Sequence, residues 1–173
     1  MSSKMVRHTM ASFQIHTDDL SVNVDPPTRP RTAVIAVNVI GVLYTAKLAM
    51  HQFAKQQKAG KNSSDFQPCL VLGGSLAGYM DIPAVTVYNT SKFAVRGLLH
   101  GLRHTAPRIK ARVGMVAPWH VETPMLSEAV GYLKGRGILM ALIEDVFAAA
   151  EELAKNQASN GMLFASWWYA CIS

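Results

Sequence analysis

Short apolar runs that alternate with helical segments constrain the fold of this chain more than any other feature. Cys69-Leu70-Val71-Leu72 is closed by Gly73-Gly74, a pattern typical of a strand that is buried on both faces. A second buried run covers residues 110–117, and a third follows at 161–165. Apolar residues at three- and four-residue steps predict helices over 32–59, 84–105 and 143–154. The expected order is helix, strand, helix, strand, helix, strand.

This order predicts an α/β fold with a parallel sheet, because short connections through helices join parallel strands. We expect an irregular segment and linker over residues 1–30, one half-domain over 31–166 and a tail over 167–173. In open α/β sheets the working residues gather at the carboxyl ends of the strands. Residues 73–78 and 118–123 are therefore the places where chemistry is expected.

The composition argues against several classes of protein. Lys and Arg total 17 against 11 Asp and Glu, but they are scattered without a dense basic run, so nucleic-acid binding is not expected. No uninterrupted apolar run reaches about 18 residues, so no membrane span is expected. The two cysteines are far apart and residues 1–17 lack a long apolar core, which favours a reducing, cytoplasmic location. His100 and His104 are spaced like zinc ligands, but no third ligand accompanies them and no metal site is predicted.

Tyr88 and Lys92 lie four residues apart within a predicted helix, so their side chains share one face. A phenol with a pKa of about 10 is a weak acid at neutral pH, but a neighbouring ammonium favours the phenolate. The pair is therefore typical of acid–base chemistry, although the same spacing also recurs on ordinary surface helices. Ser75, just beyond a predicted strand, strengthens the interpretation because its hydroxyl can donate to a carbonyl oxygen in the same crevice.

Four segments with recognisable motifs follow one another in the chain. They are Val37-Asn38-Val39-Ile40-Gly41-Val42 in the first helix, Leu72-Gly73-Gly74-Ser75-Leu76-Ala77-Gly78, Tyr88-Asn89-Thr90-Ser91-Lys92-Phe93-Ala94-Val95, and the turn Pro118-Trp119-His120-Val121-Glu122-Thr123. In this order they resemble motifs of the short-chain dehydrogenase/reductase family. Residues 137–161 are also similar to the prostaglandin-dehydrogenase-like members of that family. The resemblance covers about residues 26–165, and it implies the C-terminal half of a Rossmann-type, doubly wound parallel sheet.

The resemblance implies a role for each matching side chain in interconverting an alcohol and a carbonyl. Ser75 is expected to orient and polarise the carbonyl, and Tyr88 to exchange the proton. Lys92 is expected to lower the pKa of Tyr88, and Asn38 to position a relay water.

The same resemblance implies a nicotinamide cofactor, NAD or NADP. Lys92 would hold its ribose, and the turn that begins at Pro118 would receive the nicotinamide, with the Val121 backbone and Thr123 on the carboxamide. Trp119 stands where the family has glycine, and its indole either fills space that the nicotinamide needs or turns outward.

The first βαβ units of the family fold are not found in this sequence. A strand, a Gly-rich turn and a helix normally receive the pyrophosphate, because backbone amides and the helix dipole favour an anion there. Residues 73–78 lack the G-x-G-x-x-G spacing and already carry Ser75, so they are not a phosphate loop. Cofactor binding is accordingly expected to be weak.

Three functions remain open at this point. The first is a dehydrogenase or reductase acting on a small-molecule metabolite. The second is an isomerase, epimerase or cyclase that uses the same Ser, Tyr and Lys without nicotinamide. The third is a catalytically inactive, truncated relative. The strand at 69–72 is expected to present an open edge, for which residues 10–15 are a candidate substitute strand, and the two long helices offer a surface for a homodimer.

Overall fold

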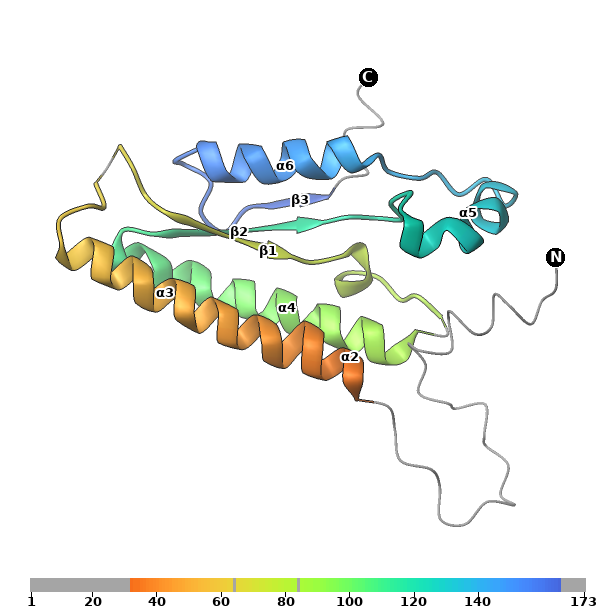
Figure 1. Cartoon of the computed structure of the whole chain (residues 1–173), viewed down its shortest axis with the longest axis horizontal. Helices are drawn as coiled ribbons and strands as arrows, with labels where there is room; N and C mark the ends of the chain where they lie inside the picture. The colour runs from red at the N-terminus through yellow and green to blue at the C-terminus, as the bar shows by residue number, and fades with distance from the viewer. Residues whose placement is uncertain (1–31, 64, 84, 166–173) are drawn as a thin grey trace, which may run out of the picture.

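The computed structural model describes residues 32–63, 65–83 and 85–165. The predicted linker over 1–30, the substitute strand over 10–15 and the tail over 167–173 lie outside the described residues. Figure 1 shows three layers, in which a sheet lies between the helices α3 and α4 on one side and the helix α6 on the other. The predicted doubly wound α/β arrangement is confirmed.

The sheet has three parallel strands in the order β1-β2-β3. They are β1 (Cys69–Gly73), β2 (Arg112–Ala117) and β3 (Leu163–Ala165). All three predicted strands are present, and β2 is buried along its whole length. Within the described part of the chain β1 is an edge strand, as expected, because it pairs with β2 and with no further strand.

Three predicted helices surround this sheet. The helix predicted over 32–59 is a continuous helical rod over residues 33–58, made of α2 (Ala33–Ile35), the π-helical turn η1 (Ala36–Gly41) and α3 (Val42–Lys58). Residues 86–105 form α4 (Thr86–Thr105), and residues 143–155 form α6 (Ile143–Lys155). The hydrophobic periodicity located these helices, whereas the π-helical turn inside the first rod has no sequence signal.

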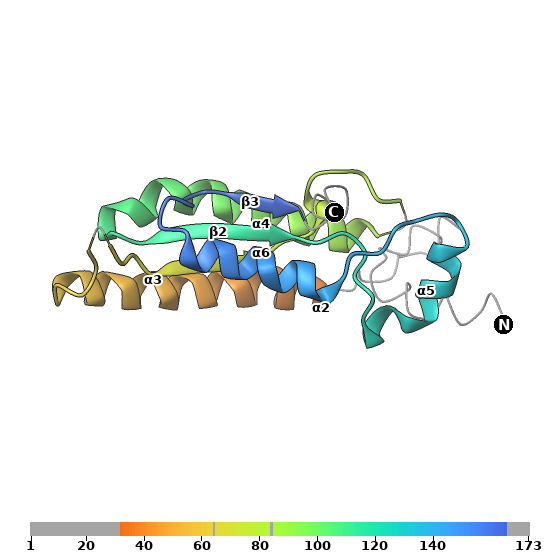
Figure 2. The same ribbon diagram turned by 90° about the horizontal axis from the view of Figure 1, so that it is seen from above.

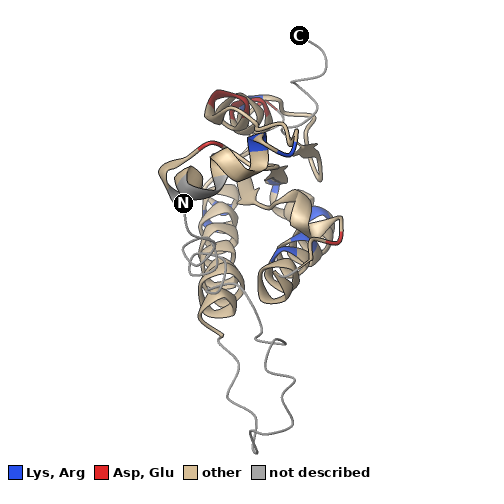
Figure 3. Ribbon diagram, turned by 90° about the vertical axis from the view of Figure 1, so that its right-hand side faces the viewer, with Lys and Arg blue, Asp and Glu red and all other residues tan. Residues whose placement is uncertain are grey.

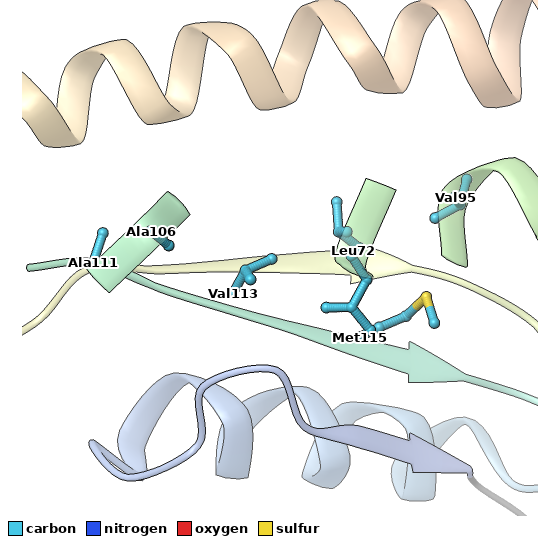
Figure 4. Packing of buried hydrophobic residues seen from close by; sticks show 7 residues of the cluster. Leu72, Val95, Ala106, Ala111, Val113 and Met115 are labelled. Carbon is cyan, nitrogen blue, oxygen red and sulfur yellow. The ribbon is translucent and has the colours of Figure 1, made fainter. Parts of the chain in front are cut away.

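The main core lies between the sheet and α4. Its buried residues come from every second position of the strands and from one stripe of α4, as expected where a strand face meets an amphipathic helix. Figure 4 shows these side chains between the two elements. They are Leu72, Val95, Leu99, Ala106, Ala111, Val113 and Met115.

The opposite face of β2 packs against α6. Val116 lies in a second buried cluster with Ala149 and Leu153. Gly114 lies against the Leu153 side chain on this face, because a Cβ at that position would come within 2.7 Å of a Leu153 methyl group, which would have to shift. Arg112, at the start of β2, is 1% exposed and points toward the same helix. The alternation of β2 thus divides its side chains between the two helical layers.

The rod formed by α2, η1 and α3 lies beside α4, as Figures 1 and 2 agree. One side of this rod carries large apolar residues that are exposed. By length and composition the segment Ala33–Lys58 could also cross a membrane, although buried core helices of soluble proteins and signal sequences meet the same criterion. The expected absence of a membrane contact stays a prediction.

Several short elements were not expected from the sequence. They include a helix, α5 (Ser127–Lys134), and three 3₁₀ turns, η2 (Leu76–Gly78), η3 (Ala106–Ile109) and η4 (Pro124–Leu126). The strand predicted to begin at residue 110 begins at Arg112, because Lys110 adopts a left-handed conformation with φ of 46° and ends η3. The coloured ribbon in Figure 3 shows acidic positions on α6 and basic positions on α4, on opposite sides of the sheet.

Candidate active site

Ser75 lies in the turn that follows β1, at the carboxyl end of the sheet. Its backbone is extended, and its Oγ accepts a hydrogen bond from the amide of Ala77, which caps η2. The hydroxyl donates to the carbonyl oxygen of Pro118 across 3.4 Å. This second hydrogen bond is long for an O–H donor, so the proton is weakly held and can turn toward another acceptor.

The Ser75 turn is fixed by backbone contacts to β2. The amide of Gly74 donates to the carbonyl of Val116 (2.8 Å), and the amide of Leu76 donates to the carbonyl of Pro118 (3.1 Å). A Cβ on Gly74 would lie 2.6 Å from the Met115 sulfur. The Gly74 amide is thus bonded to β2, and glycine leaves room for the Met115 side chain; the rejection of this segment as a phosphate loop stays a prediction.

Tyr88 and Lys92 lie in the first two turns of α4. The Lys92 Nζ is 5.5 Å from the centre of the Tyr88 ring, close enough for a cation–π contact. The same ammonium donates to the carbonyl oxygen of Gly73, the last residue of β1, across 3.2 Å. Burial lowers the pKa of Lys92 below the ordinary lysine value, because desolvation disfavours the charged form. Lys92 thus lies beside Tyr88 on the same helix, and its hydrogen bond to Gly73 also places it beside the Ser75 turn.

Asn38 occupies the π-helical turn η1, and its contact runs to α4. Its Nδ2 donates to the Oγ of Ser91 across 3.1 Å. Ser91 in turn donates to the backbone carbonyl of Tyr88 across 2.7 Å. Single-turn π-helical segments often mark functional sites, because the extra residue re-aims a side chain. Asn38 therefore reaches the site through Ser91.

The loop after β2 carries the remaining predicted residues. The carbonyl of His120 accepts a hydrogen bond from the amide of Ala141 (2.7 Å), and Val121 forms an isolated parallel bridge with Ala141. Thr123 caps η4, where its carbonyl accepts a hydrogen bond from Leu126 (2.9 Å). These contacts hold the loop from Pro118 to Thr123 at the same end of the sheet as Ser75.

Trp119 lies in this loop next to His120. Their ring centres are 4.3 Å apart in an edge-on arrangement. His120 is partly buried, and desolvation lowers the pKa of its imidazole. The side chain that replaces the family's glycine is therefore packed against a neighbour in the loop.

The described residues fit one end of a nicotinamide cofactor. Lys92 offers a half-buried ammonium at the end of β1, and Val121 and Thr123 lie in a loop held by backbone bonds. Within residues 32–63, 65–83 and 85–165 the Gly-rich turn after β1 carries Ser75 and continues into η2 rather than directly into a long helix, so it does not match the G-x-G-x-x-G turn that receives a pyrophosphate.

The structure brings most of the predicted residues together, and it adds others. At the strand ends Ser75 donates to the Pro118 carbonyl and Lys92 donates to the Gly73 carbonyl, two residues before Ser75. Tyr88 lies under the Lys92 ammonium. Sequence reasoning missed Ser91 and the Gly73 carbonyl. A polar residue in the apolar stripe of α4 was the available signal for Ser91, whereas nothing in the sequence marks a backbone carbonyl as the partner of Lys92.

A half-sheet of Rossmann type, with a serine after one strand and a tyrosine and a lysine on the adjacent helix, is the arrangement expected of a nicotinamide-dependent dehydrogenase. Comparison with protein families agrees, because residues 25–131 match the model of the short chain dehydrogenases. The chain belongs to the short-chain dehydrogenase/reductase family.

Curated relatives are dehydrogenases and reductases. The chain is 37% identical over 142 residues to 5'-hydroxyaverantin dehydrogenase of Dothistroma septosporum, a match that covers 79% of this chain and 46% of the relative. It is 32% identical over 129 residues to diacetyl reductase [(S)-acetoin forming] of Staphylococcus aureus, with 70% and 47% covered. The chain thus spans about half the length of these relatives.

Solved structures share the fold. The 3-hydroxyacyl-CoA dehydrogenase type-2 of Mycobacterium avium matches with a TM-score of 0.67 and 25% identity, over 78% of this chain and 53% of that one. The 3-ketoacyl-(acyl-carrier-protein) reductase of Brucella melitensis, solved with NADH, matches with a TM-score of 0.65 and 22% identity, over 76% and 53%. These likenesses confirm the Rossmann-type sheet.

Proposed function

We propose that this chain carries the catalytic centre of an oxidoreductase that interconverts an alcohol and a carbonyl on a small-molecule metabolite. The placement of the Lys92 ammonium supports this most directly, because it lies 5.5 Å from the Tyr88 ring and donates to Gly73, two residues before Ser75. The dehydrogenase and reductase names of the relatives favour redox chemistry over an isomerase, epimerase or cyclase.

In the direction of reduction, each protein group has one task. Ser75 turns its hydroxyl from the Pro118 carbonyl to the substrate oxygen and polarises it. Tyr88 transfers its phenolic proton to that oxygen as the carbonyl becomes an alcohol. Lys92 stabilises the phenolate that remains, because a cation close to the ring favours the anion. A bound nicotinamide cofactor supplies the hydride for the carbonyl carbon.

The proposal is tested first by cofactor binding. Titration of the chain with NADPH and with NADH, followed by tryptophan fluorescence, should show saturable binding of one or both. The affinity is expected to be weak, because the described residues offer no pyrophosphate site. Absence of binding at millimolar concentrations of both cofactors would overturn the redox function for this chain.

Turnover is tested with diacetyl, whose reduction gives one relative its name, and with a panel of other ketones and alcohols. Tyr88→Phe should lose at least about 100-fold in kcat, because the proton donor is removed while the ring remains. Tyr44→Phe is the matched control, since Tyr44 is an exposed tyrosine on α3 with no part in the proposed chemistry, and removal of its hydroxyl alone should keep the wild-type rate. Equal activity of both variants would contradict the assignment of Tyr88.

We also propose that the chain forms a homodimer through its long helices and works in the cytoplasm. The support is the exposed apolar side of the rod, where Val37, Tyr44 and Leu48 are 70%, 69% and 69% exposed. Burying such side chains against a second copy removes apolar surface from water. Light scattering should report a dimer that Leu48→Glu dissociates. A monomer that sediments with lipid vesicles would overturn both proposals.

A further inference from the structure

Ser91 is the polar member of an otherwise apolar stripe. The buried residues of α4 are Val87, Ser91, Val95 and Leu99, which repeat every four positions and face the sheet and its neighbours. Ser91 is 0% exposed. A hydroxyl at such a position costs free energy unless it is hydrogen-bonded, and alanine would fill the same space without that cost. The presence of serine at this position is therefore explained by the hydrogen bonds that its hydroxyl makes.

Those partners lie on two different elements. Ser91 Oγ accepts from Asn38 Nδ2 in η1 (3.1 Å) and donates to the carbonyl of Tyr88 in α4 (2.7 Å). In a regular helix the Tyr88 carbonyl is also the acceptor for the Lys92 amide, four residues on. The Ser91 hydroxyl therefore binds the Tyr88 carbonyl, which is the same backbone group that accepts from the Lys92 amide in a regular helix.

Thr90 is a useful comparison with Ser91, because it is a hydroxyl residue of α4 whose hydrogen bond stays within the helix. Its Oγ1 donates to the carbonyl of Thr86 across 2.9 Å, and its side chain is exposed. Bonds of this kind satisfy the hydroxyl locally and bend a helix only slightly. Ser91 makes the same kind of bond to its own helix but adds a partner from the neighbouring rod. Because of this additional hydrogen bond Ser91 connects two elements, whereas the hydrogen bond of Thr90 stays within α4.

We propose that Ser91 is a positioning residue, which couples the π-helical turn at Asn38 to the first turns of α4 and thereby fixes the placement of Tyr88 and Lys92. The inference rests on the proposed function, because the placement matters only if the pair performs chemistry. Asn38 thus orients the site through two successive hydrogen bonds, from its side chain to Ser91 and from Ser91 to the Tyr88 carbonyl. This role is in addition to any water that Asn38 holds.

The position of Tyr88 can be read without turnover. In protein labelled with ¹³C-tyrosine, Tyr88→Phe identifies the aromatic cross-peak of Tyr88. Ser91→Ala should move this peak by more than its linewidth, whereas Thr90→Ala, which removes a local hydroxyl bond from the adjacent residue, should leave it in place. In the Asn38→Ala background, Ser91→Ala should add little further displacement, because both substitutions break the same bond.

An unmoved Tyr88 peak in Ser91→Ala, or equal movement in Thr90→Ala, would overturn the inference. If Ser91→Ala does not fold, Asn38→Ala breaks the bond from its other end, and an unmoved peak in that variant would equally overturn it. Additive displacements of the two single substitutions would show that Asn38 and Ser91 act separately, which also contradicts the coupling.

Kinetics provide a second measurement that a merely structural role would not change. Ser91→Ala should lower kcat by about 10-fold or more, since small misplacements of catalytic groups are costly, and should shift the midpoint of the pH–rate profile. A lower amount of folded enzyme would reduce the rate without moving that midpoint. If the wild-type chain shows no turnover, the proposed function fails, while the Tyr88 peak still decides the role of Ser91.

Discussion

Gly78 lies directly against the backbone of Lys92, so that a Cβ on Gly78 would come within 2.8 Å of the Lys92 carbonyl oxygen. Gly78 ends the 3₁₀ turn that Ser75 caps, and Lys92 belongs to α4. Glycine therefore allows the serine turn and the catalytic helix to approach each other. The contact links the two elements whose side chains are proposed to act on one substrate.

Gly78→Ala is expected to push the turn away from α4, because the obstacle is a backbone atom that cannot rotate aside. The free energy of unfolding should fall by about 1–3 kcal/mol, and any turnover should fall with it. The measurement is urea denaturation followed by circular dichroism. Gly97→Ala is the matched control on the exposed side of α4, where a Cβ meets nothing within 4 Å, and it should be neutral or stabilising by up to about 1 kcal/mol. Equal losses in both variants would refute the steric explanation.

Arg112→Met is expected to destabilise the fold strongly. The buried guanidinium donates to the carbonyls of Leu153 (2.8 Å) and Ala154 (2.8 Å) in the last turn of α6, and to Ser159 Oγ (2.8 Å). A cation at a helix C-terminus is favoured by the dipole, and its loss leaves several buried acceptors without a donor.

The expected loss is about 3 kcal/mol or more in the free energy of unfolding, measured by urea denaturation. Arg108→Met serves as the comparison, because Arg108 lies exposed in η3, and it should change stability by no more than about 0.5 kcal/mol. A loss below about 1 kcal/mol for Arg112→Met, which is the cost of one ordinary hydrogen bond, would show that water replaces the guanidinium.

Lys92 should make stability depend on alkaline pH. Because burial lowers its pKa in the folded chain, the unfolded chain binds a proton that the folded chain has released between the two pKa values. The free energy of unfolding should therefore rise as pH rises through the lowered value toward the ordinary lysine value. Urea denaturation of the wild type and Lys92→Met, from neutral pH upward, isolates this contribution. Their difference should change across that window, and parallel curves would contradict the burial of the charge.

Trp119→Gly should strengthen the binding of NADPH or NADH if the indole occupies space that the nicotinamide needs. The side chain is packed edge-on against His120 in the loop expected to receive the nicotinamide. Calorimetric titration of the variant and the wild type measures the change, and an increase in affinity of about 10-fold or more is expected, corresponding to about 1.4 kcal/mol. Unchanged affinity would show that the indole already lies outside that space.

The sequence by itself determined the order of helices and strands and the residues at the strand ends. Local hydrophobic patterns indicate buried strands and amphipathic helices, so β1, β2, α4 and α6 were predicted close to the bounds that the structure shows. The spacing of Tyr88 and Lys92 along one helix is equally local. These features needed no knowledge of which element lies beside which.

Only the tertiary structure decided which groups meet. Periodicity shows that a face is buried but not what it contacts, so the bond from Lys92 to the Gly73 carbonyl and the link from Asn38 to Ser91 were invisible in the sequence. Arg112 is the strongest case, because an arginine is ordinarily expected at the surface. It is buried because the carbonyls at the end of α6 converge on it, and that convergence exists only once β2 and α6 have packed together.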